Sequence, residues 1–80
     1  MTVYILPDGR KTTSLMLPKE IKRFFTLDDY LEILYANNPK SEVDYMTRRE
    51  LEEGYYEYIG EVYLSQPWRM EEELGIREVR

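Results

Sequence analysis

Residues that interrupt regular structure divide this chain into short segments, and that spacing constrains the fold more than any other feature. Breaks fall at Pro7-Asp8-Gly9, at Asn37-Asn38-Pro39, at Gln66-Pro67 and at Gly75. Proline fixes φ and lacks an N–H group, while glycine and asparagine tolerate left-handed backbone. The chain must therefore be built from short strands and short helices.

The first break predicts a β-hairpin. Two β-prone runs, residues 2–6 and 10–17, flank the Pro-Asp-Gly turn. Pro18 cannot donate a ladder hydrogen bond, so we expect the second strand to end at Leu17. Residues 18–25 follow with apolar side chains at helical spacing, which predicts one or two helical turns.

Two capping patterns mark the starts of longer helices. Thr26 with Asp29 precedes apolar residues at i, i+3, i+4 and i+7, and this helix should stop at the Asn-Asn-Pro break. Thr47 with Glu50 forms a capping box for the next helix. Its continuation through Tyr55–Leu64 also fits a strand, but separate apolar and acidic stripes at a 3.6-residue period favour helix.

The carboxyl-terminal part predicts one more short helix. Pro67 suits the first helical position, and Gly75 suits the residue that ends the helix at Leu74. Residues 76–80 fit either a closing strand or a frayed tail.

Eighty residues suffice for one thin hydrophobic core. We therefore expect residues 1–80 to form a single α+β domain, an amino-terminal β-hairpin packed on two or three short helices. The predicted core consists of apolar residues on the inward faces of these elements: Val3, Ile5, Leu15, Leu17, Ile21, Phe24, Leu27, Leu31, Leu34, Leu51, Tyr55, Tyr58, Ile59 and Val62.

Composition excludes much of enzyme chemistry. The chain has no cysteine and no histidine, so thiol catalysis, imidazole catalysis and Cys/His zinc sites are ruled out. The carboxylate pairs Glu53/Glu57 and Asp28/Asp29 would need a partly dry cleft to separate their pKa values, and a thin core offers little room for one. The acidic run 71–73 lacks calcium-loop spacing. We expect no enzyme activity, no cofactor and no metal site.

No apolar run is long enough to span a bilayer, and the amino terminus lacks a signal-peptide pattern. The expected location is the cytoplasm, without membrane association.

Charge is distributed unevenly along the chain. Residues 1–23 carry five basic and two acidic groups, a balance of +3, whereas residues 24–80 carry six basic and fourteen acidic groups, a balance of −8. Fields of one sign attract partners of the other sign. The acidic part of the chain therefore predicts a basic partner.

The sharpest acidic feature is a glutamate stripe on the predicted helix after Thr47. Such a row is often only a solvated helix face, but it also fits a groove that binds nucleic-acid phosphates. Aromatic residues beside it either shield the core or anchor an interface. The candidate partner-binding residues are Glu50, Glu53, Glu57, Glu61, Tyr56, Tyr63 and Trp68.

These features predict a small non-catalytic protein that binds, and inhibits, a basic nucleic-acid-handling protein. The row would act as a DNA mimic, as in phage anti-host inhibitors and antitoxins. A different possibility is a structural or assembly subunit, a homodimer or larger homo-oligomer whose interface contains Tyr56, Tyr63 and Trp68.

A further alternative comes from the basic amino-terminal part. Gly9-Arg10, residues 17–23 (LPKEIKR) and residues 29–33 (DYLEI) resemble the DNA-binding half of AbrB/MazE-type swapped-hairpin proteins. This resemblance implies that residues 30–35 form a strand and that the acidic remainder resembles an antitoxin tail in a basic toxin groove. It implies a DNA-binding regulator, for which the candidate nucleic-acid contacts are Arg10, Lys11, Lys22 and Arg23. Direct nucleic-acid binding is the less expected function, because the whole chain is negatively charged.

Overall fold

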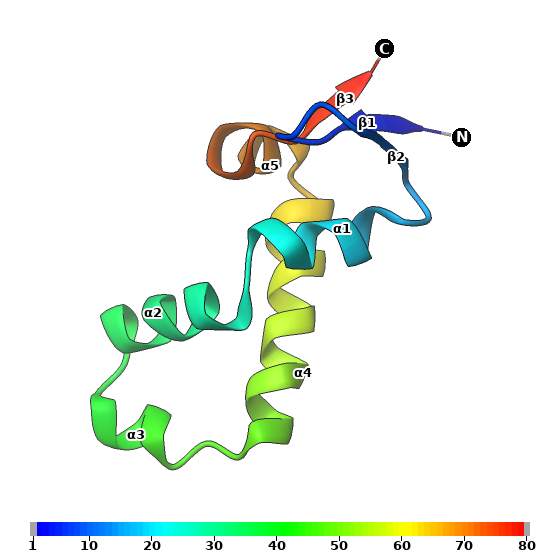
Figure 1. Ribbon diagram of the computed structural model, residues 1–80. Coiled ribbons are helices and arrows are strands. Elements are labelled where there is room, and N and C mark those ends of the chain that lie inside the picture. The colour runs from blue at the N-terminus through cyan, green and yellow to red at the C-terminus, as the bar shows by residue number, and fades with distance from the viewer. Residues whose placement is uncertain (1, 80) are drawn as a thin grey trace.

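The computed structural model describes residues 2–79 and shows a small α+β domain, elongated to 44 × 21 × 20 Å. A three-stranded sheet and α5 lie at one end, α3 lies at the other, and α4 runs between them (Figure 1). The elements in chain order are β1 (Val3–Ile5), β2 (Lys11–Thr13), α1 (Leu17–Phe24), α2 (Leu27–Asn37), α3 (Lys40–Asp44), α4 (Arg48–Tyr58), η1 (Ile59–Leu64), α5 (Pro67–Leu74) and β3 (Arg77–Val79).

The predicted hairpin is confirmed. β1 and β2 pair antiparallel, and Gly9 takes a φ of 88° in the turn between them. The strand ends at Thr13, however, and not at Leu17, because residues 14–16 turn the chain directly into α1. Leu15, expected in the core, lies in that turn and is 78% exposed.

The carboxyl-terminal segment completes the sheet. β3 pairs antiparallel with the free edge of β1, which gives the strand order β2-β1-β3. Residues 77–79 are thus a closing strand and not a frayed tail. Tyr4 packs against the core cluster, whereas Val3 and Ile5, expected inside, are only half-buried and point to the other face of the sheet. Residue 80, part of the predicted segment 76–80, lies outside the described residues.

The helix starts follow the capping patterns. The Thr26 side chain accepts a hydrogen bond from the Asp29 N–H at 3.3 Å, and the Asp29 carboxylate accepts the Thr26 N–H at 2.9 Å. Thr47 and Glu50 form the same reciprocal pair. The strand over residues 30–35 implied by the AbrB/MazE resemblance is wrong, since these residues lie within α2. The sequence did not predict α3, whose five residues follow Pro39.

The helix that begins at Arg48 does not stay α-helical. After Tyr58 it continues as the π-helix η1, and the Ser65 N–H bonds to the Gly60 carbonyl five residues back at 3.1 Å. This wider turn holds more residues than the 3.6 of an α-helix. Side chains four residues apart therefore align, and Tyr55, Ile59 and Tyr63 form one buried row.

The π-helix changes which aromatic side chain enters the core. A 3.6-residue period placed Val62 inside and Tyr63 on the flank, but Tyr63 is 2% exposed while Val62 is half-buried. Tyr63, predicted as an interface residue, is therefore buried in the core and is not exposed to a partner in this structure. The preference for helix over strand in residues 55–64 is confirmed.

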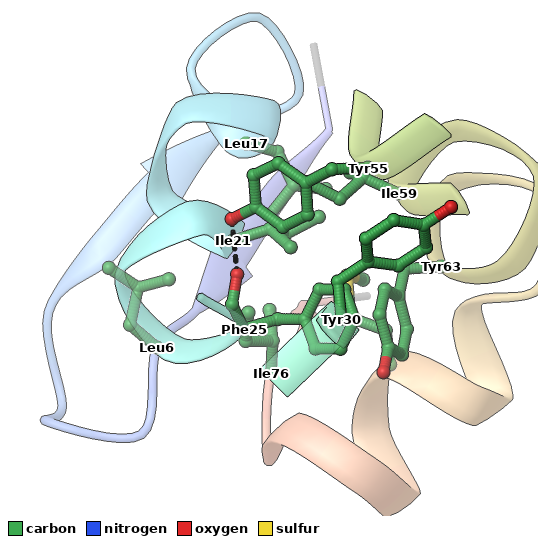
Figure 2. Packing of buried hydrophobic residues seen from close by; sticks show 10 residues of the cluster. Leu6, Leu17, Ile21, Phe25, Tyr30, Tyr55, Ile59, Tyr63 and Ile76 are labelled. Atoms are coloured by element: carbon green, nitrogen blue, oxygen red, sulfur yellow. Dashed lines mark hydrogen bonds between the residues drawn. The ribbon is translucent and has the colours of Figure 1, made fainter. Parts of the chain in front are cut away.

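Aromatic packing joins α1 to α4 and η1. Phe25, just after α1, stacks on Tyr55 with ring centroids 5.8 Å apart and meets Tyr63 edge-on at 5.1 Å. The Tyr55 hydroxyl donates a hydrogen bond to the Phe25 carbonyl (Figure 2). The core cluster consists of Leu6, Leu17, Ile21, Phe25, Tyr30, Tyr55, Ile59, Tyr63, Met70 and Ile76.

Four predicted core residues, Leu17, Ile21, Tyr55 and Ile59, are fully buried. Other predicted members are only partly buried, because neighbours such as Phe25 and Tyr30 occupy the inward positions of their segments. These partly buried residues are Phe24, Leu27, Leu31, Leu34, Leu51, Tyr58 and Val62.

Two glycines in the long helix give a matched pair of predictions. A Cβ at position 54 would lie 2.5 Å from the Tyr30 hydroxyl oxygen, whereas a Cβ at position 60 would meet nothing within 4 Å. We expect Gly54→Ala to lower the free energy of unfolding by about 1–3 kcal/mol through overpacking. Gly60→Ala should leave it unchanged or raise it by up to about 1 kcal/mol. Urea denaturation measures both.

The glycine prediction has an internal control. Tyr30→Phe removes the colliding oxygen, so adding it to Gly54→Ala should restore much of the lost stability. Equal stability of the two alanine variants would show that α2 and α4 do not approach at Gly54.

Buried tyrosines predict sensitivity to alkali. Burial raises the pKa of Tyr30, Tyr55 and Tyr63, so these phenols stay neutral in the folded state above the usual pKa of about 10, at which they ionise in the unfolded chain. Their contribution to stability is complete below pH ~10 and is lost as pH rises above it. We expect the urea concentration at the unfolding midpoint to decrease as the pH is raised from ~8 to ~11. The last part of the tyrosinate absorbance should appear only together with unfolding.

Tyr63→Phe is the control, because it keeps the ring in the core and removes one titrating group. Its urea midpoint should fall less over the same pH interval. Tyrosinate absorbance that is complete before any unfolding would contradict the prediction.

Candidate partner-binding surface

An exposed acidic row runs along α4 and η1. Glu53, Glu57 and Glu61 repeat every four residues, two positions away from the buried residues Tyr55, Ile59 and Tyr63. Two helical residues correspond to a rotation of about 200°, so the acidic row lies on the side opposite the core. Glu53 and Glu57 lie in α4 and Glu61 lies in η1, so the acidic row continues from the α-helix into the π-helix. We call Glu53, Glu57 and Glu61 the acidic row.

The predicted stripe also included Glu50, which has a local role. Its carboxylate accepts hydrogen bonds from the Thr47 N–H at 3.4 Å and the Thr47 hydroxyl at 3.1 Å. Glu50 is exposed, but its position is set by the helix cap. It extends the negative field one turn beyond the acidic row without belonging to its four-residue spacing.

Arginines of α4 pair with part of its negative charge. Arg49 Nε lies 3.2 Å from a Glu53 carboxylate oxygen, and the side chains are 88% and 67% exposed. Exposed pairs of this kind are weak, about 0–1 kcal/mol, and leave the carboxylate open to competing partners. Glu57 and Glu61 form no ion pair with any residue from 2 to 79. The strongest uncompensated charge is thus on the carboxyl-terminal half of the row.

Of the two tyrosines predicted to flank the acidic row, one is exposed and the other is buried. Tyr56 is 51% exposed, and Lys22 Nζ lies 4.1 Å from its ring centroid, a cation–π contact between α1 and α4. The buried Tyr63 faces the other way, and its hydroxyl donates to Glu73 at 3.3 Å. Of these two tyrosines only Tyr56 is available to a partner.

Trp68 lies on α5 and is 61% exposed, so it does not fill the core. It lines a surface hollow with Pro67, Glu71 and Glu78. Glu71 and Glu78 were not predicted from the sequence as neighbours of Trp68. The i, i+3 spacing of Trp68 and Glu71 signals one helix face, but nothing local in the sequence indicates that strand residue 78 comes next to them.

Two of the basic amino-terminal residues, Arg10 and Arg23, are paired with acidic ones. Arg10 contacts Asp8 at 3.0 Å and Glu20 at 3.4 Å, and Arg23 contacts Glu20 at 2.9 Å and Asp8 at 3.9 Å. The Arg10 backbone N–H holds the pKa of Asp8 below its usual value, which keeps this carboxylate ionised. Lys11 is exposed near the turn. Of the four candidate nucleic-acid residues, Arg10 and Arg23 therefore form an ion network with carboxylates of their own segment, whereas Lys11 and Lys22 form no ion pair with any residue from 2 to 79.

The carboxylate pairs considered for catalysis occupy exposed or capping positions. Asp29 caps α2, and Glu53 and Glu57 stand on the solvent side of α4. Within residues 2–79, no group of three or more acidic side chains gathers closely enough to hold a metal ion. No helix in that part of the chain has the length and apolar character needed to cross a membrane.

Comparison of the chain with protein-family models, with curated proteins and with solved structures gave no match.

The ion network gives a prediction about nucleic acid. We expect the protein to pass through immobilised duplex DNA at about 0.1 M salt, since Asp8 and Glu20 compensate the two arginines. The variant Asp8→Asn with Glu20→Gln frees Arg10 and Arg23 and should be retained longer in the same column. Retention of the unchanged protein, lost in Arg10→Ala with Arg23→Ala, would instead support the DNA-binding regulator.

Proposed function

We propose that this protein is a non-catalytic binding protein whose acidic row docks into the basic cleft of a nucleic-acid-handling protein. The observation that carries the proposal is the exposed row Glu53, Glu57 and Glu61, spaced four residues apart and away from the buried Tyr55, Ile59 and Tyr63. If the occupied cleft is the one that normally binds nucleic acid, the complex is inhibited. This is the mode of action expected of a DNA mimic, as in a phage inhibitor or an antitoxin.

The rigidity of the row supports this proposal. Tyr55, Ile59 and Tyr63 hold the underside of the helix in the core, so the carboxylates project from a frame that does not need ordering when a partner binds. In the α-helical part of the row, Glu53 and Glu57 are about 6 Å apart along the axis, four residues at 1.5 Å each. One DNA strand offers a charge about every 3.4 Å, so the row reproduces part of a strand's charge.

The charge balance of the surrounding chain also supports a basic partner. Residues 48–79 contain nine acidic and four basic side chains. Three of those basic groups pair within their own helices, Arg48 with Glu52, Arg49 with Glu53 and Arg69 with Glu73. Residues 48–79 therefore carry a net negative charge, which speeds association with a cationic surface. Salt screens this attraction and should weaken the complex.

The homo-oligomer alternative loses one of its proposed contacts. Tyr63 is buried and cannot reach a second copy, and Tyr56 is covered in part by Lys22.

The test is a charge-neutral variant of the row. Glu53→Gln, Glu57→Gln and Glu61→Gln keep side-chain size and remove three exposed charges. Exposed ion pairs contribute about 0.2–1 kcal/mol each, so affinity for the partner should fall roughly 3- to 150-fold. The partner is obtained by affinity capture from cells that make the protein, and its affinity is measured by calorimetry over a range of salt concentrations.

A matched control removes the same amount of charge elsewhere. Asp28→Asn, Glu32→Gln and Glu42→Gln neutralise three exposed carboxylates of α2 and α3 and should leave affinity within about threefold of the unchanged protein. Duplex DNA should compete for the captured partner. If both triple variants lose the same affinity for the partner, only net charge matters. If the variant of the acidic row keeps its full affinity, the proposed function is refuted.

A further inference from the structure

The hollow beside Trp68 combines residues that are distant in sequence. Trp68 is the second residue of α5, and Glu71 follows three positions later on the same helix face. Glu78 comes from β3, which packs next to α5 (Figure 1). With Pro67 these residues line a hollow of about 240 Å³. The pairing of β3 with β1 brings Glu78 to the same hollow as Trp68.

The core does not need the indole of Trp68. Met70, two residues further along α5, fills the buried side of this helix and is 1% exposed, while Leu74 packs against the same cluster. Two helical positions correspond to a rotation of about 200°, so Trp68 stands on the outer side. The indole is left as one wall of the hollow, with most of its surface open to water.

The two carboxylates of the hollow have no counter-charge among the described residues. Glu73, on the same helix, pairs with Arg69 at 2.6 Å, but neither Glu71 nor Glu78 forms an ion pair or a side-chain hydrogen bond within residues 2–79. Arg77 precedes Glu78 in β3, and successive strand residues point to opposite faces, so its side chain leaves the hollow. The hollow therefore presents an aromatic face and two negative groups.

We propose that this hollow binds one arginine side chain of the basic partner, its guanidinium stacked on Trp68 and paired with Glu71 and Glu78. A planar guanidinium suits both surfaces, because it stacks on aromatic rings and donates hydrogen bonds in its own plane to carboxylates. The inference rests on the proposed function, because it takes the partner to be basic. The acidic row attracts positive charge whatever the partner's sequence, and the hollow adds one specific contact to that attraction. Tryptophan and arginine are also the residues most enriched among strong interface contacts.

The experiment uses the only tryptophan of the chain as reporter. The indole N–H of Trp68 gives one cross-peak in an ¹⁵N–¹H spectrum of the whole protein. It is followed while a short, end-blocked glycine peptide with a single arginine is added, and then with matched peptides in which lysine or glutamine replaces arginine. We expect a saturable shift with arginine, a dissociation constant at least threefold weaker with lysine, and no saturable shift with glutamine.

Paired variants locate the binding. Glu71→Gln with Glu78→Gln should weaken the arginine peptide at least fivefold, while Glu72→Gln with Glu32→Gln, exposed residues outside the hollow, should change its dissociation constant less than twofold. In Trp68→Ala, the backbone cross-peaks of residues 71 and 78 should no longer shift. Fold integrity of each variant is checked by the unchanged dispersion of the remaining spectrum.

Each result bears on the inference separately from the proposed function. An equal shift with the glutamine peptide, or equal affinity in the two paired variants, would overturn the hollow as a cation site, and equal affinity for lysine would overturn its selectivity for arginine. The triple variant at Glu53, Glu57 and Glu61 separates the two proposals. If this variant still binds the captured partner, the acidic row is refuted. If it also binds the single-arginine peptide normally, the inference about the hollow is retained.

Discussion

The structure depends on an aromatic cluster that fixes α1 against α4 and η1. Phe25 lies among Tyr55, Tyr58 and Tyr63, with ring centroids 5.1 to 5.8 Å apart, and its carbonyl accepts the Tyr55 hydroxyl. A chain of this size has little aliphatic material for a core, and large rings bury much area with few rotatable bonds. The Tyr55 hydroxyl donates to the Phe25 carbonyl and the Tyr63 hydroxyl to Glu73, and no buried side-chain oxygen or nitrogen in residues 2–79 is left unsatisfied.

The π-turn links this cluster to the outer surface. A regular α-helix would rotate Tyr63 away from Tyr55, and the cluster would lose its edge-on contact with Phe25. The wider turn brings Tyr63 inward, and it keeps Glu61 in line with Glu57 on the opposite side. Core packing and surface charge are therefore set by the same local departure from α-helical geometry. This connection explains how an exposed acidic row can continue from α4 into η1.

Features with a local cause were predictable from the sequence, and features that arise from long-range packing were not. The hairpin turn, both capping boxes and the stop at Gly75 follow from backbone preferences of a few neighbouring residues. The face of β1 that meets the core depends on where α1 and α5 lie, so Tyr4 was missed. The π-turn has no recognised sequence signal here, and Tyr63 was consequently assigned to the surface. For the candidate surface, the glutamates were placed correctly as exposed residues, whereas the shared hollow of Trp68 and Glu78 required the sheet to close.

Closure of the sheet has a consequence for the order of assembly. β1 and β3 are separated by most of the chain, so their pairing must wait for a large loop to close, while the hairpin and helices form from near neighbours. β3 is an edge strand with three exposed residues, and segments of this kind open at low free energy without unfolding the remainder. Fraying of this strand would carry Glu78 away and leave α5 in place. The hollow at Trp68 is thus complete only while β3 stays paired with β1. The affinity of the hollow for a cation therefore reports how often β3 separates from the sheet.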